Sequence, residues 1–175
     1  MRSIRSWLGR VEIAASEDHL LYVGVGGGEA VGFLRARGLP SPAGVGGGLI
    51  DEAEAQLIEY FEGTRKSFTL PACFFGTDFQ VRVWEKTMEI PYGFTRSYTW
   101  VAREIGCSSP RPVGRALSAN HLMLVVPCHR VVEAHGGLGG FSADLSLKKK
   151  LLQHEARHAG EGTAIKLNPP RYTVS

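Results

Sequence analysis

The sequence contains no long hydrophobic run, and this shortage excludes membrane proteins built from spanning helices. No apolar stretch among the 175 residues approaches the roughly 20 residues that a spanning helix needs. The cationic start is not followed by a long apolar core either. We therefore expect neither a signal peptide nor a membrane partner.

Cysteine is also scarce, because the chain has three, and they are widely spaced. An odd and scattered set of cysteines argues against the disulfide framework of a small secreted protein. It favours a reducing compartment, and we expect a cytoplasmic protein. A single bridge between Cys73 and Cys107 stays possible on these grounds.

Neither sign of charge dominates the chain, whose formal net charge is +3, but the charges are unevenly distributed. Residues 1–84 hold 8 Lys and Arg against 10 Asp and Glu, whereas residues 85–175 hold 12 against 7. A basic half suits an anionic partner such as DNA. The excess is small, so charge alone favours nucleic acid only weakly.

The first part of the chain, residues 1–77, is expected to form a small α/β domain. Residues 9–38 partly alternate apolar and polar side chains, which favours short strands. A Gly- and Pro-rich loop is expected at 39–48, followed by a helix over 49–61, where apolar residues recur at helical spacing. The apolar run at 68–75 predicts another strand.

The second part, residues 78–175, is expected to be mainly helical. Two short helices joined by a turn at Gly106 are typical of a helix-turn-helix. The run Lys148-Lys-Lys150 is either a solvated surface or a DNA contact. The helices are predicted at 78–88 with Asp78 as its cap, at 97–105, at 111–119 and at 146–158.

Residues 126–132 read Val-Pro-Cys-His-Arg-Val-Val and carry the clearest chemical signal in the chain. They place a thiol, Cys128, beside the imidazole of His129 and the fixed cation of Arg130. A thiol is a strong nucleophile only as the thiolate, which a neighbouring base or cation favours. The apolar flanks predict a buried strand that reaches the surface at the cysteine. The alternative is a structural cysteine that packs as a small hydrophobe.

Further blocks are spaced around this heptad over roughly residues 78–158. In chain order they are Phe79-Gln-x-x-Val-Trp84, Ile90-Pro-x-Gly93, Ser97-Tyr98, Ser109-Pro-Arg-x-Val-Gly114, Asn120, the heptad, Gly139-Gly-Phe-Ser142 and Leu151-Leu-x-x-Glu155. Together they resemble the O6-alkylguanine-DNA alkyltransferases, a family of single-use DNA-repair methyltransferases. The resemblance implies an α/β fold: a ribonuclease-H-like N-terminal domain, then a mainly helical, winged-helix-like DNA-binding domain with a helix-turn-helix and an active-site cysteine.

The resemblance also implies a role for each catalytic residue. Cys128 would accept the alkyl group of O6-alkylguanine, and of O4-alkylthymine, as an irreversible thioether. His129 would act as the general base through a water, oriented by Glu155. Tyr98 would donate a proton to the departing base, and Asn120 would tie the recognition helix to the active-site turn.

The same resemblance implies how the substrate is held. Arg111 would enter double-stranded DNA from the minor groove and replace the flipped nucleotide. Main-chain carbonyls at Cys128 and Val131 would accept from the exocyclic amine of guanine, and Ser142 would face O6. No metal or organic cofactor is implied, and the protein would act as a monomer. The other substrate-binding candidates are Phe141 and Arg130, and the other DNA-binding candidates are Arg115, Ser109 and Ser97.

One departure from the family pattern bears on the recognition helix. Pro112 follows Arg111, where the family usually has Ala. Proline fits only the first helical turn, so the helix is expected to start close to this position.

Residues 154–158 read His-Glu-Ala-Arg-His and match the zinc-protease pattern H-E-x-x-H. A catalytic zinc needs a third protein ligand, and the 17 residues after His158 offer only Glu161. A zinc metalloprotease is therefore the main alternative activity. The second alternative is a non-catalytic damage-binding module, against which the presence of Cys128 argues.

Overall fold

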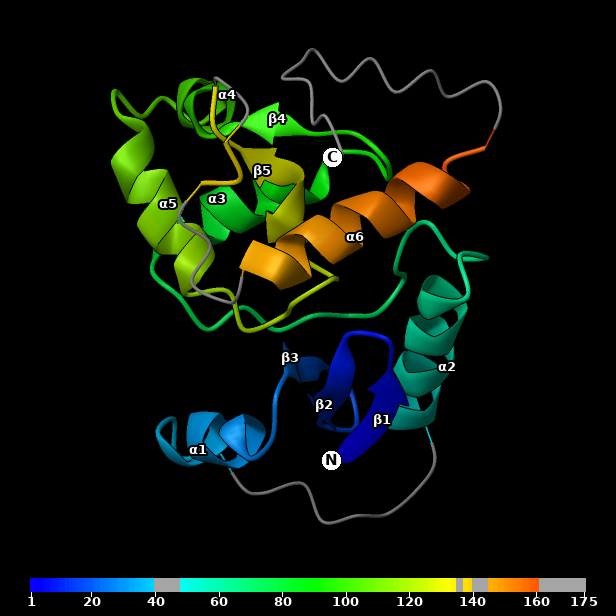
Figure 1. Ribbon diagram of the computed structural model, residues 1–175. Helices are drawn as coiled ribbons and strands as arrows, with labels where there is room; N and C mark the ends of the chain where they lie inside the picture. Colours follow the sequence, from blue (N-terminus) through cyan, green and yellow to red (C-terminus); the bar gives the residue numbers. More distant parts are fainter. Residues whose placement is uncertain (40–47, 135–136, 140–144, 161–175) are drawn as a thin grey trace. The chain divides into compact units, whose positions relative to one another are not determined.

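The computed structural model describes residues 1–39, 48–134, 137–139 and 145–160 (Figure 1). The chain forms two compact units, the first of which comprises Met1–Phe75 together with His121–Val125. The second comprises Gly76–Asn120 and the chain from Val126 onward. The division expected after residue 77 differs from this one at residues 76–77 and at the short segment 121–125.

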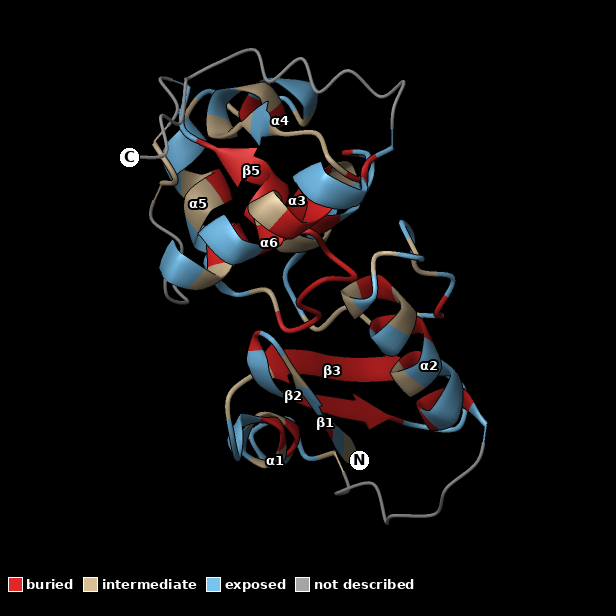
Figure 2. Cartoon of the chain, turned by 45° about the vertical axis from the view of Figure 1, so that its right-hand side comes forward, coloured by how far each residue is buried: buried red, intermediate tan, exposed pale blue. Residues whose placement is uncertain are grey.

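The first unit contains a three-stranded antiparallel sheet in the order β1 (Arg2–Ser6), β2 (Gly9–Ala15) and β3 (Leu20–Val25). Strand β2 is central and pairs with both neighbours, so that Val11 lies opposite Ile4 and Val25. The second half of β2 and most of β3 are buried (Figure 2). The sheet therefore forms the core of this unit.

Two helices pack against this sheet, α1 (Glu29–Arg35) and α2 (Leu49–Phe61). Helix α2 has the bounds that its spacing predicts. Helix α1 was missed, because its residues fall within a segment predicted as strands. Its first turn is stabilised by a buried carboxylate from β2, since Glu12 accepts from the N–H groups of Gly28 and Ala30. A helix cap supplied by a different element leaves no signal in the local pattern.

Two further strand predictions are wrong. Residues 68–75 form no strand, only a bridge between Ala72 and Leu20, and Pro71 interrupts the run because it lacks a backbone donor. Before the heptad, Leu122 bridges to Val23, and the chain then turns at Leu124, whose φ is 75°. These segments are buried by packing rather than by regular strand pairing.

The second unit is mainly helical, with one short pair of parallel strands. The structure thus has the α/β class and the helical second part that the resemblance implies. The elements are α3 (Asp78–Met88), β4 (Arg96–Ser97), α4 (Tyr98–Glu104), α5 (Pro110–Ser118), the short 3-10 helix η1 (Cys128–Arg130), β5 (Val131–Val132) and α6 (Leu145–His158).

Helices α3, α4 and α5 begin at capping side chains. The cap of α3 is Thr77 rather than Asp78, because Thr77 and Gln80 bond reciprocally in a capping box. Helices α4 and α5 are joined by a turn in which Gly106 has a φ of 71°. The buried indole N–H of Trp84 on α3 donates to the Ala116 carbonyl at 2.9 Å. This bond holds α5 against α3.

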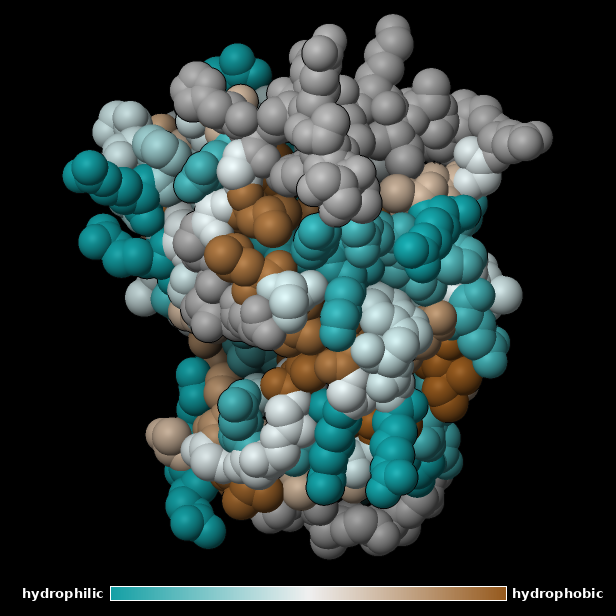
Figure 3. All heavy atoms as spheres, in the orientation of Figure 1, coloured by the Kyte–Doolittle hydropathy of each residue, from teal (hydrophilic) through white to brown (hydrophobic). Residues whose placement is uncertain are grey.

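Hydrophilic side chains cover much of the face seen in Figure 3. No helix in the described part of the chain is long and apolar enough to cross a membrane. All three cysteines are free, so the bridge between Cys73 and Cys107 that the sequence allowed is absent.

Candidate active site and DNA-binding helices

Cys128 lies at the start of η1 and is buried, with 5% of its surface exposed. The expectation of a strand that brings this thiol to the surface is therefore wrong. The N–H of Cys128 donates to the Val126 carbonyl at 2.8 Å, which closes a tight turn. The Asn120 amide donates to the Cys128 sulfur at 3.3 Å and to the same carbonyl at 3.0 Å. Asn120 thereby ties the end of α5 to the turn that carries the thiol.

The environment of Cys128 keeps its thiol protonated at rest. Burial raises the pKa of Cys128, while the Asn120 hydrogen bond and the charge of Lys148 act in the opposite direction. The heptad alone therefore does not ionise the thiol, since burial outweighs its neighbours. Reaction at this sulfur requires a base that removes the proton.

His129 provides a neutral imidazole beside the thiol-bearing residue. It is fully buried, and its Nε2 lies 2.7 Å from Oε1 of Glu155. Because a carboxylate only accepts, Nε2 carries the proton and Nδ1 keeps its lone pair. Burial lowers the pKa of His129 against the raising effect of Glu155. Nδ1 has no hydrogen-bond partner within the described residues, so it can accept a proton.

Glu155 on α6 is the carboxylate on which this site is assembled. Its oxygens accept three hydrogen bonds from Nε and Nη2 of Arg130, at 3.0 to 3.2 Å, and one from the N–H of Gly93 at 2.9 Å. Burial raises its pKa, but the charges and hydrogen bonds of His129 and Arg130 prevail and hold the pKa of Glu155 well below its ordinary value. Glu155 is therefore ionised and fixes the orientation of the imidazole.

Arg130 does not have the position expected of the substrate-binding residue that the sequence suggested. Its guanidinium is buried against Glu155, and Nη1 donates to the Ile90 carbonyl at 2.7 Å. It also lies over the ring of Tyr92, 5.6 Å from the ring centre. Arg130 therefore orients the carboxylate from inside the unit. The turn from Ile90 to Gly93 contributes one backbone acceptor and one backbone donor to this arrangement.

Lys148 is the residue that the sequence interpretation missed. It is fully buried, neither a solvated surface residue nor a DNA contact, whereas Lys149 and Lys150 are exposed. Its ammonium donates to the Val131 carbonyl at 2.5 Å, to the Leu138 carbonyl and to the Tyr98 hydroxyl. Helical spacing could have revealed it. The buried residues of α6 are Lys148, Leu151, His154 and Glu155, which share one face.

Tyr98 and Val131 lie next to Lys148. The hydroxyl of Tyr98 accepts from Lys148 at 3.4 Å. Burial, together with the charges of Cys128 and Glu133, raises the pKa of Tyr98 to about 12. A phenol with this pKa stays protonated at neutral pH and can donate. Val131 is fully buried, and its carbonyl is the main-chain group that the resemblance assigns to guanine.

The DNA-binding candidates lie on α5 and at the residues that precede α4 and α5. Arg111 and Arg115 are exposed and one helical turn apart on α5. Helix α5 begins at Pro110, so Pro112 lies in the first turn, as expected. The hydroxyls of Ser97 and Ser109 accept from backbone N–H groups at the starts of α4 and α5, and both serine side chains therefore act as caps. Phe141 and Ser142 lie outside the described residues.

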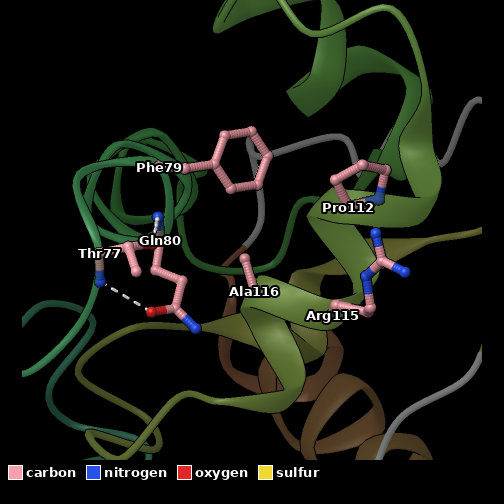
Figure 4. A pocket seen from close by; sticks show the side chains of 6 residues that line it. All are labelled: Thr77, Phe79, Gln80, Pro112, Arg115 and Ala116. Atoms are coloured by element: carbon pink, nitrogen blue, oxygen red, sulfur yellow. Dashed lines mark hydrogen bonds between the residues drawn. The ribbon is translucent and has the colours of Figure 1, made fainter.

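A pocket of about 210 Å³ lies between the start of α3 and helix α5 (Figure 4). Arg115 and Pro112 face Phe79 across it, and the Thr77 N–H donates to the side-chain oxygen of Gln80 at 2.8 Å. None of the residues that line it belongs to the thiol, imidazole and carboxylate set. It therefore adjoins the DNA-binding candidates rather than the nucleophile.

The zinc alternative is not favoured by this geometry. Glu155, which would be the general base of the H-E-x-x-H pattern, already bonds His129, Arg130 and Gly93. His158 Nδ1 lies 2.8 Å from the His154 carbonyl, and the centres of the two tilted imidazole rings lie 4.4 Å apart. His154 and Glu155 of the pattern therefore belong to the buried face of α6, whereas His158 is exposed.

Three features define the class of protein: a buried thiol, a neutral imidazole held by a carboxylate, and a helix-turn-helix tied to the thiol turn. The class is that of proteins with a cysteine nucleophile beside a DNA-binding helix pair. The sequence profile "6-O-methylguanine DNA methyltransferase, DNA binding domain" matches residues 78–157. The inducible methylated-DNA–protein-cysteine methyltransferase of Bacillus subtilis is 42% identical over 107 residues, which are 61% of this chain and 60% of that protein. A methyltransferase of the same name from Methanosarcina acetivorans is 45% identical over 105 residues, 59% and 67% of the two chains.

Solved structures extend the likeness to the first unit. Mycobacterium tuberculosis OGT in complex with DNA aligns with a TM-score of 0.76 at 32% identity, covering 89% of this chain and 92% of that one. An O6-methylguanine-DNA methyltransferase from Pyrococcus kodakaraensis aligns with a TM-score of 0.64 at 26% identity, covering 88% and 96%. The chain belongs to the family of methylated-DNA–protein-cysteine methyltransferases. The resemblance stated from the sequence and its fold class are thus confirmed.

Proposed function

We propose that this protein repairs DNA by moving the alkyl group of O6-alkylguanine irreversibly to the sulfur of Cys128. The observation that carries the proposal is the connected set in which Glu155 holds His129 with Nδ1 unprotonated, next to the buried thiol. Membership of the methyltransferase family supports it. O4-alkylthymine is a second substrate on the same chemistry.

The first step is removal of the thiol proton. His129 Nδ1 takes it through a water, and Glu155 stabilises the imidazolium that results. The pKa of Cys128 is raised by burial, so little thiolate exists before this transfer. The Asn120 hydrogen bond and the charge of Lys148 stabilise the thiolate once it forms.

The second step is displacement at the alkyl carbon. The thiolate forms the sulfur–carbon bond while the carbon–O6 bond breaks, and that electron pair goes to the purine. Tyr98 donates its proton to the base, which leaves as ordinary guanine. The main-chain carbonyls of Cys128 and Val131 accept from the exocyclic amine, and Ser142 faces O6. A thioether does not hydrolyse, so each protein molecule reacts once.

The reaction requires the damaged nucleotide to leave the helix, because the thiol is buried. We propose that α5 binds the minor groove of double-stranded DNA and that Arg111 fills the gap left by the flipped nucleotide. Arg115 and the backbone at Ser97 and Ser109 contact phosphates, and Phe141 forms a wall of the base pocket. The protein acts as a monomer in the cytoplasm, a reducing compartment that the free cysteines suit.

Incubation with O6-benzylguanine tests the proposal directly. We expect intact mass to increase by one benzyl group per chain, and peptide mapping to place this group on Cys128. Cys128→Ala should give no adduct, and Cys107→Ala, at a half-buried cysteine, should react like the unaltered protein. Absence of the adduct, or an adduct that disappears with turnover, would overturn the proposal.

A further inference from the structure

The pocket between the start of α3 and helix α5 takes no part in the proposed alkyl transfer, although it lies beside the DNA-binding candidates (Figure 4). Its volume is about 210 Å³, and all the residues that line it belong to the second unit. Sites for drug-sized ligands occupy about 300–1,000 Å³. This pocket therefore suits a smaller group, such as one planar heterocycle.

The pocket has an aromatic wall on one side and a guanidinium with a proline on the other. The ring of Phe79 is half-buried and faces Pro112 and Arg115 across the space (Figure 4). Within the described part of the chain, this ring contacts no other aromatic ring and no cation, and Arg115 forms no ion pair. Nucleobases stack on aromatic side chains and on guanidinium planes. A base between these walls would meet both surfaces.

Gln80 adds a hydrogen-bond donor to the lining of the pocket. Its side-chain oxygen accepts from the Thr77 N–H at 2.8 Å as part of the capping box of α3. This bond fixes the amide, and the amide nitrogen has no hydrogen-bond partner among the residues that the structure describes. Every nucleobase carries acceptors on its edges, so each can accept from such an amide.

The start of α3 is less suited to a phosphate. Helix N-termini bind anions through unpaired N–H groups and the helix dipole. Here the capping box already occupies the N–H groups of Thr77 and Gln80. Asp78 also places a carboxylate in the first turn. An uncharged planar group avoids repulsion by that carboxylate, so the lining favours a base of the DNA over its backbone.

We propose that this pocket is a second nucleobase site, which takes one unpaired base of the bound DNA between Phe79 and Arg115, with the amide of Gln80 at its edge. Pro112, in the lining, directly follows Arg111, the residue proposed to replace the flipped nucleotide. That replacement leaves a base without its partner, and an unpaired base leaves the stack at low cost. The inference rests on the proposed binding of DNA by α5 and not on alkyl transfer.

Two short undamaged duplexes test the site, one with a single unpaired adenine and one with an abasic residue at the same position. The abasic residue keeps the flexibility of the unpaired position and removes only the base. Fluorescence anisotropy of labelled duplexes gives both dissociation constants. We expect the unaltered protein to bind the adenine duplex about fivefold or more tighter, which is the effect of stacking one base on an aromatic side chain.

Phe79→Leu removes the aromatic wall and keeps an apolar side chain. The matched control is Phe61→Leu, at a half-buried phenylalanine of the first unit. We expect Phe79→Leu to bring the ratio of the two dissociation constants close to one and the control to leave it unchanged. Thermal unfolding checks that each variant is folded.

Gln80→Glu tests the hydrogen bond without loss of the helix cap, because glutamate also forms the capping box with Thr77. It removes the amide donor and should lower the ratio by about threefold. Repulsion between the new carboxylate and the phosphates weakens both duplexes alike and cancels in the ratio. This variant also serves as the test if Phe79→Leu does not fold.

The outcomes separate the pocket from DNA binding as such. A ratio that falls in Phe79→Leu and Gln80→Glu but not in Phe61→Leu supports the site. Equal binding of the two duplexes by the unaltered protein overturns it. A full preference for adenine in folded Phe79→Leu also overturns it, because the base then binds elsewhere, as over Cys128. If neither duplex binds, the proposed DNA binding by α5 fails, and the second site fails with it.

Discussion

At the scale of single residues, the balance of charge around Glu155 determines how the site responds to acid. The carboxylate bonds the ring of His129, the guanidinium of Arg130 and the N–H of Gly93. Its pKa is lowered in the folded protein. A lowered carboxyl pKa stabilises the fold above the ordinary carboxyl range, and this contribution is lost as the pH falls below that range.

We expect Glu155→Gln to destabilise the protein by about 3–5 kcal/mol at pH 7, because the buried charge of Arg130 loses its counter-ion. The difference from the unaltered protein should shrink as the pH falls below about 4.5, because Glu155 then becomes protonated in the unfolded chain while it is still ionised in the folded one. Urea unfolding at pH 7, 4 and 3 measures both effects. Glu85→Gln, at an exposed carboxylate on α3, should show neither, and a difference of constant size at all three pH values would refute the linkage.

Asn120 provides a graded test of thiolate stabilisation. Its amide donates to the Cys128 sulfur at 3.3 Å, and this bond lowers the pKa that burial has raised. Asn120→Ala removes the donor, and Asn120→Asp replaces it with a negative charge. The rate of Cys128 alkylation by iodoacetamide at pH 7.5 should be lower in Asn120→Ala than in the unaltered protein, and lower still in Asn120→Asp. It should fall about tenfold for each unit by which the thiol pKa rises. Equal rates in both variants would show that the bond does not act on the thiolate.

At the scale of elements, α5 combines two tasks on opposite faces. Val113, Ala116 and Leu117 are buried, and Trp84 bonds the Ala116 carbonyl, so one face fixes the helix. Arg111 and Arg115 lie on the exposed face. The chain after α5 then connects to the thiol through Asn120. The proposed binding of this helix to DNA would therefore be mechanically linked to the position of the thiol.

We expect Arg111→Ala to slow repair of O6-methylguanine in duplex DNA by about tenfold or more, because flipping costs a few kcal/mol and the filler is lost. Reaction with free O6-benzylguanine, which needs no flipping, should be unaffected. Arg115→Ala is the comparison, since loss of a phosphate contact should weaken duplex binding and lower its salt dependence by about one charge. Equal losses on duplex and free base for Arg111→Ala would contradict the flipping role.

At the scale of the whole molecule, a short segment of the second half of the sequence belongs to the first unit. His121–Val125 pairs with β3, since Val23 N–H donates to the His121 carbonyl at 2.8 Å and Met123 N–H to the Val23 carbonyl at 2.9 Å. Cys128 follows this segment by three residues. The first unit therefore anchors the chain that enters the thiol turn.

A fragment that begins at residue 76 should lose this anchor. We expect its reaction with O6-benzylguanine to be at least several-fold slower than that of the full chain, and residues 121–125 to be cut readily by protease, because their backbone groups lose the β3 partners. Rates and proteolysis of fragment and full chain measure this. A fragment that reacts as fast and resists protease equally would show that the first unit has no such role.

The sequence by itself determined the family and the helices at 49–61 and 78–88, and it predicted Cys128, His129 and Glu155 as a set. These features depend on local periodicity and on residue types in a fixed order, and both can be read along the chain. The tertiary structure decided what depends on residues distant in sequence. It buried Cys128 and so raised its pKa, turned Arg130 inward to Glu155, and capped α1 with Glu12.

Lys148 shows the physical reason for this division most clearly. In the sequence it is one of three consecutive lysines, and each has the same charge and the same preference for water. Only the packing of α6 selects which of them faces the core, and desolvation then makes that lysine bind the carbonyls of Val131 and Leu138. Residue type sets what chemistry is available, and burial decides which groups take part in it.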